Sequence, residues 1–117
     1  MTLTADPRVH ATRYDVRPTA WDRMHPIERR LWVVSVEDAG AAGWAVRTAA
    51  SPRWAANRRG HFIHESSHPL SNKTRRYPLE EALAIALKVV DHITVSGATP
   101  EQAATHYEQI TASKETP

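Results

Sequence analysis

The chain has 117 residues, of which 41% are hydrophobic and 24% are charged, and its formal net charge at neutral pH is +2. This length is typical of a single domain. Cysteine is absent, which excludes disulfides, thiolate metal sites and cysteine nucleophiles. No apolar run approaches the roughly 18 residues that cross a bilayer, and the N-terminus has no apolar leader segment, so we expect a cytoplasmic protein that does not enter the membrane.

The two ends of the chain have the composition of segments outside a fold. The opening segment mixes proline with scattered charge, and residues 1–17 are predicted to form a flexible N-terminal arm. Residues 113–117 are predicted to be a disordered tail. The residues between them, 18–112, are expected to form a single α+β domain.

An antiparallel hairpin is predicted after this arm. Residues 30–36 are rich in β-branched and aromatic side chains that are apolar on both faces, which is typical of a central strand. Gly40 and Gly43 supply turn chemistry, and residues 44–49 then alternate between larger and smaller or charged side chains. The simplest interpretation is two strands joined by this turn.

After the hairpin, the sequence pattern first predicts a short helix and then a third strand. Ser51 and Pro52 have the pattern of a helix N-cap followed by a first-turn proline, so residues 53–59 are expected to form a short helix that ends at Gly60. Residues 61–64 fit a third strand, and the polar residues that follow are expected to form a loop.

Two helices are predicted in the last third of the chain. Apolar residues recur at helical spacing from Leu79 to Ile93, which indicates an amphipathic helix that Gly97 can end. Thr99 and Gln102 have the spacing of a capping box and begin a second helix. The predicted fold is therefore a two- or three-stranded antiparallel sheet covered by one long helix, with a short C-terminal helix.

The segment from Arg47 to Tyr77 is strongly basic. It carries seven cationic side chains and one acidic side chain, Glu65. Guanidinium groups bind phosphate in a bidentate manner, and exposed aromatic rings stack on bases. The predicted nucleic-acid-binding residues are Arg47, Arg53, Trp54, Arg58, Arg59, Lys73, Arg75 and Arg76. The alternative is that these charges lie on solvated loops and only keep the protein soluble.

A group of histidines follows within the same segment. His61, His64 and His68, together with Glu65, supply ligand types that bind metal ions. On a strand, however, His61 and His64 point to opposite faces, and the flanking glycine and proline disfavour the helical path that would align all three. We therefore predict no metal site.

No catalytic motif is recognisable in the sequence. Ser66, Ser67 and His68 provide a nucleophile and a base as residue types, but no nucleophile elbow surrounds them. The four glycines form neither a phosphate-binding loop nor a dinucleotide fingerprint. We predict a small noncatalytic binding protein without a cofactor, which binds nucleic acid or acts as a regulator through the Arg-rich segment.

The four tryptophans support a second hypothesis about function. Trp32 and Trp44 are expected in the core, which leaves Trp21 or Trp54 as exposed candidates. Exposed tryptophans frequently anchor protein interfaces. The alternative to nucleic-acid binding is therefore a modulator that engages a host or partner protein through an aromatic face or the C-terminal helix.

Two short motifs resemble a group of small bacterial and phage proteins. Trp44-Ala-Val46-Arg47 on a strand, followed by Arg76-Tyr77-Pro78-Leu79-Glu80-Glu81-Ala82 at the start of a helix, is similar to small proteins encoded by high-GC bacteria, of the actinobacterial type, and their phages. The resemblance covers residues 44–92. It implies no catalytic activity; its implication is a context in which small proteins bind nucleic acid or capture a host protein.

Overall fold

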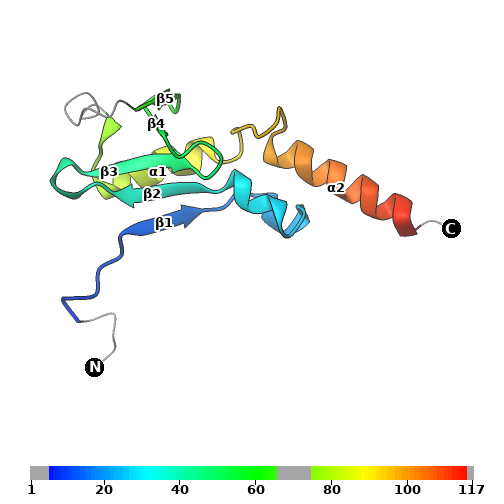
Figure 1. Ribbon diagram of the computed structural model, residues 1–117, viewed down its shortest axis with the longest axis horizontal. Coiled ribbons are helices and arrows are strands. Elements are labelled where there is room, and N and C mark those ends of the chain that lie inside the picture. The colour runs from blue at the N-terminus through cyan, green and yellow to red at the C-terminus, as the bar shows by residue number, and fades with distance from the viewer. Residues whose placement is uncertain (1–5, 66–74, 116–117) are drawn as a thin grey trace.

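The computed structural model describes residues 6–65 and 75–115 as a five-stranded antiparallel sheet with two α-helices (Figure 1). The strands follow one another across the sheet in chain order, each paired with the next. Their bounds are β1 Arg13–Val16, β2 Val34–Asp38, β3 Trp44–Thr48, β4 Trp54–Ala56 and β5 Phe62–His64. The helices are α1 Leu79–Val89 and α2 Pro100–Glu115, and the described residues also include the short 3₁₀ turns η2 Trp21–Arg23, η3 Glu28–Trp32 and η4 Gly40–Ala42.

The predicted sheet of two or three strands is wrong, because strands β1 and β4 were not foreseen. β1 falls within residues 1–17, which the sequence indicated as an arm, and all four of its residues pair with β2. β4 replaces the short helix expected over residues 53–59. Ala55 pairs with Arg47 of β3, and both Ala55 and Ala56 are fully buried. Tertiary pairing therefore overrides the local helix signal at Ser51 and Pro52.

The central hairpin β2–β3 carries the core of the sheet. Val36 pairs with Val46, and these two side chains and Val34 have no exposed surface. They pack against α1 through its buried residues Ala82 and Ala86. The start of the predicted first strand instead forms η3, so β2 begins only at Val34.

Helix α1 is joined to the sheet at its N-terminal side by Tyr77. This residue is 1% exposed, and its hydroxyl donates a hydrogen bond of 2.8 Å to the carbonyl oxygen of Ala56. The helix ends at Val89, earlier than the sequence indicated, and the Val89 carbonyl accepts hydrogen bonds from the amides of His92 and Ile93. Gly97 therefore does not end α1.

Helix α2 belongs to a second, smaller core at the end of the sheet (Figure 1). The predicted capping box is present: the Thr99 amide donates to Gln102 Oε1 at 2.9 Å, and the Gln102 amide donates to Thr99 Oγ1 at 3.3 Å. Ala104 is fully buried against Met24 and Trp32. Within the described part of the chain, no helix is both long and apolar enough to cross a membrane.

Candidate functional site

The structure divides the predicted arginines into two groups. In the first group, Arg47, Arg75 and Arg76 converge on the carboxylate of Glu65. Arg76 binds it with both terminal nitrogens, at 2.8 and 2.9 Å. Arg47 also contacts it, and Arg75 Nε lies 3.6 Å from it. We call these four residues the Glu65 cluster.

The Glu65 cluster is largely shielded from solvent. The Glu65 side chain is 7% exposed, and that of Arg76 is 10% exposed. Burial by itself raises the pKa of Glu65, but the hydrogen bond from Arg76 and the charge of Arg47 outweigh this effect and lower the pKa. Glu65 is therefore ionised, and its three arginines are engaged inside the fold rather than presented to an external phosphate.

The second group consists of Arg53, Arg58 and Arg59, which are exposed on the β4–β5 hairpin with Trp54. Trp54 is 42% exposed, whereas Trp32 is buried and Trp44 is half-buried against the core. Arg58 Nε donates to Glu81 of α1 at 2.7 Å, and 72% of its side chain remains exposed. The eighth predicted residue, Lys73, lies outside the described residues.

The turn of this hairpin is held by Asn57. Its side-chain oxygen accepts hydrogen bonds from the amides of Arg59 and His61, each at 3.0 Å. Gly60 completes the turn with a φ of +82°, and a Cβ at this position would lie only 2.6 Å from Val89 Cγ1. The turn therefore packs directly on the C-terminal end of α1, which fixes the positions of the two arginines beside it.

A pocket of about 630 Å³ opens where the hairpin meets the end of α1. Its apolar lining is aromatic on the hairpin side, from Trp54 and Phe62, and aliphatic on the α1 side. Arg59, Lys88 and His92 supply basic groups. The remaining lining residues are Thr48, Ser51, Gly60, Val89, Ile93 and Thr94. Among the described residues that line this pocket, none is acidic, so its charge favours an anion.

Lys88 and His92 were not predicted as site residues. In the predicted helix their spacing of four would place them on one side, whereas in the structure Lys88 lies in the last turn of α1 and His92 lies three residues beyond its end. That spacing was visible in the sequence. Nothing in the local pattern, however, indicated that this end of α1 lines a pocket together with Trp54, because the pocket depends on how the β4–β5 hairpin docks.

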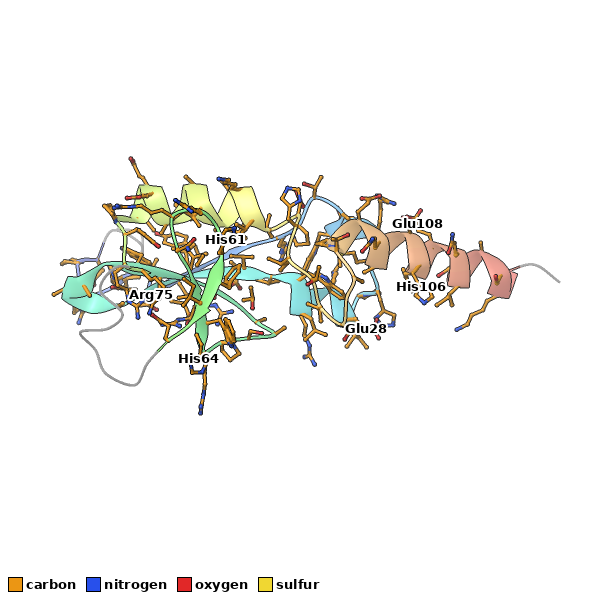
Figure 2. All side chains as sticks on the ribbon, turned by 90° about the horizontal axis from the view of Figure 1, so that it is seen from above. Glu28, His61, His64, Arg75, His106 and Glu108 are labelled. Atoms are coloured by element: carbon orange, nitrogen blue, oxygen red, sulfur yellow. The ribbon has the colours of Figure 1, made fainter. Side chains whose placement is uncertain are left out.

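Of the three histidines in this segment, the structure describes His61 and His64. Figure 2 shows His61, just before β5, nearer to α1, and His64, the last residue of β5, farther from it. Over residues 6–65 and 75–115, no group of three histidine, aspartate or glutamate side chains could hold a metal ion. His68 lies outside the described residues. His64 instead contacts Trp54 edge to face, with ring centroids 5.5 Å apart.

Comparisons of the chain with protein-family models, with curated proteins and with solved structures gave no significant match. The function is therefore argued from the site itself.

Proposed function

We propose that this chain is a noncatalytic nucleic-acid-binding protein that uses the β4–β5 hairpin and the adjoining end of α1. The observation that carries the proposal is an exposed tryptophan beside a basic pocket, with further exposed arginines on the same hairpin. Phosphate contacts by arginine combined with base stacking on an aromatic ring are the usual means of binding a strand without a catalytic site.

The proposed contact residues differ from those suggested by charge alone. Arg58, Arg59 and Lys88 are exposed and supply the phosphate contacts, while Arg53 is exposed before β4. The ion pair between Arg58 and Glu81 is solvent-exposed and contributes little, so a phosphate can replace the carboxylate. The arginines of the Glu65 cluster serve the fold and are left out of the proposed interface.

The test is the salt dependence of binding to labelled oligonucleotides. The variant Arg58→Ala, Arg59→Ala, Lys88→Ala removes three proposed contacts. We expect it to bind at least about tenfold more weakly at low salt, and to reduce the slope of log K against log salt by about 2 to 3, which is 0.7 to 0.9 for each lost contact. Fluorescence anisotropy at two or more salt concentrations measures both quantities.

A control variant removes the same charge from elsewhere on the surface. Arg13, Arg30 and Lys114 are exposed and lie outside the pocket lining, so their replacement by alanine should leave most of the binding intact. The proposal is abandoned if the wild type binds no DNA or RNA at low salt, or if the two triple variants weaken binding equally.

A second candidate function is supported by a groove between α2 and η3. This groove has a volume of about 760 Å³, and Leu31, Trp32, Tyr107 and Ile110 contribute to its lining. Leu31 and Ile110 are 36% and 40% exposed, which is the kind of apolar surface that a partner protein covers. Binding at this groove would resist salt and would be lost in Ile110→Asp, whereas oligonucleotide binding would not change.

A further inference from the structure

We infer that the pocket beside Trp54 receives one unstacked nucleobase, so that the chain prefers single-stranded nucleic acid to duplex. This inference rests on the proposed function and specifies the form of its ligand.

The strand register places the aromatic side chains on the same face of the sheet as α1. Trp54 pairs with His64, and Ala56 pairs with Phe62. Side chains alternate along a strand, so all four point to the face on which Ala56 is buried in the core with α1. Trp54 and Phe62 are therefore diagonal neighbours across β4 and β5, and their rings form an apolar wall beside the end of α1.

The contact with His64 helps to prepare this wall for stacking. The two rings are nearly perpendicular, with an interplanar angle of 83°. This contact restrains the Trp54 side chain although 42% of the residue is exposed. A restrained ring loses less conformational entropy on binding, which favours stacking of a flat ligand.

The polar groups of the pocket suit a planar ligand that carries negative charge. Arg59, Lys88 and His92 supply the basic groups, and the hydroxyls of Ser51 and Thr94 can bond to the edge of a base. A volume of about 630 Å³ lies within the range of small-ligand pockets, about 300–1,000 Å³. A base within a duplex is stacked and paired, so it cannot enter such a pocket without being extruded.

The surface around the pocket suits a single strand of nucleic acid better than a free mononucleotide. Arg53 and Arg58 are exposed on either side of β4 but do not line the pocket. They offer cationic contacts beyond the single nucleotide that the pocket can hold. We therefore assign the pocket to one base of a longer single strand whose backbone continues along the hairpin.

The experiment compares a labelled single strand of about 12 nucleotides with a duplex of the same sequence, by fluorescence anisotropy. The wild type should bind the single strand at least about tenfold more tightly. Trp54→Leu should lose about 5- to 150-fold in affinity for the single strand, because stacking on one aromatic ring is worth about 1–3 kcal/mol. Its affinity for the duplex should stay nearly unchanged.

Two further variants separate stacking from a general disturbance. Trp54→Phe keeps an aromatic ring and should retain most of the affinity for the single strand. Tyr14→Leu removes a partly exposed aromatic ring on β1, outside the pocket, and should behave as the wild type. In the wild type, addition of the single strand should shift the amide resonances of Trp54, Phe62 and His92, a result that does not depend on any variant folding.

The outcomes distinguish this inference from the proposed function. If neither form of nucleic acid binds, the proposed function fails. If both forms bind equally and Trp54→Leu weakens neither, the inference is wrong while the proposed function stands. Adenosine monophosphate that binds as tightly as the strand would overturn the assignment to a strand, and amide shifts confined to residues outside the pocket would overturn the site.

Discussion

At the scale of single residues, Glu65 engages three of the basic side chains that the sequence suggested for binding nucleic acid. Three of the seven cations counted in the sequence surround its carboxylate, and they join β3, the end of β5 and the residues before α1. Because the pKa of Glu65 is lower in the folded chain than its ordinary value, the ionised group stabilises the fold.

We predict that Glu65→Gln lowers the free energy of unfolding by about 3 kcal/mol at pH 7, because it removes the ionised carboxylate that Arg76 binds with two hydrogen bonds in the interior. The stabilisation is fully present above the unfolded pKa of about 4.3, and it is lost as the pH falls through the lower folded pKa. Urea denaturation at pH 7 and at pH 3 should therefore show a smaller difference between variant and wild type at pH 3. Glu80→Gln, at an exposed position, is the control and should cost less than about 1 kcal/mol.

At the scale of elements, the docking of the β4–β5 hairpin on α1 creates the candidate site. Gly60 lies at this contact. Its φ is positive, and a Cβ at this position would lie only 2.6 Å from Val89 Cγ1. Gly97 has almost the same φ, +81°, but a Cβ there would meet nothing within 4 Å. Replacing Gly97 therefore tests backbone strain alone, whereas replacing Gly60 tests backbone strain together with a close contact.

We predict that Gly97→Ala costs about 1 kcal/mol, which is the usual penalty for an L-residue in the left-handed region. Gly60→Ala should cost at least about 1 kcal/mol more, because Val89 must move away from the new methyl group. Thermal and urea unfolding of the two variants measure the difference. Equal losses would show that the hairpin does not rest on α1 as described. Gly60→Ala should also weaken oligonucleotide binding, because it displaces the wall of the pocket.

At the scale of the whole molecule, the described residues form two hydrophobic cores. The larger core joins the sheet to α1 and supports the pocket, while the smaller one holds α2 against the 3₁₀ turns. Ile93 packs against both. The candidate nucleic-acid surface therefore lies next to the larger core, and the apolar groove of α2 lies next to the smaller one.

We predict that Ala104→Asp loosens α2 without removing the oligonucleotide site, because a charge at this fully buried position cannot be solvated. Amide hydrogen exchange along α2 should become faster, while the amides of β2 and β3 remain protected. The affinity for the single strand should change less than about threefold. A loss of binding as large as that of Trp54→Leu would mean that the two parts are not independent.

The elements that could be predicted are those whose sequence patterns lie within a few neighbouring residues. The β2–β3 hairpin, the start of α1 and the capping box of α2 are encoded by neighbouring residues, through alternation, helical spacing and side-chain caps. β1 and β4 are four and three residues long, and their stability comes from pairing with distant strands. The helix expected over residues 53–59 was wrong because this pairing outweighs a local cap.

The same distinction applies to the candidate site. The sequence alone established the absence of cysteine chemistry, the basic character of residues 47–77 and the presence of Trp54 among those charges. Folding determined which arginines face a buried carboxylate, which remain exposed, and that Lys88 and His92 of the α1 end meet the hairpin. Composition and periodicity are properties of near neighbours, whereas charge neutralisation and pocket formation depend on distances between residues that only the packed chain brings together.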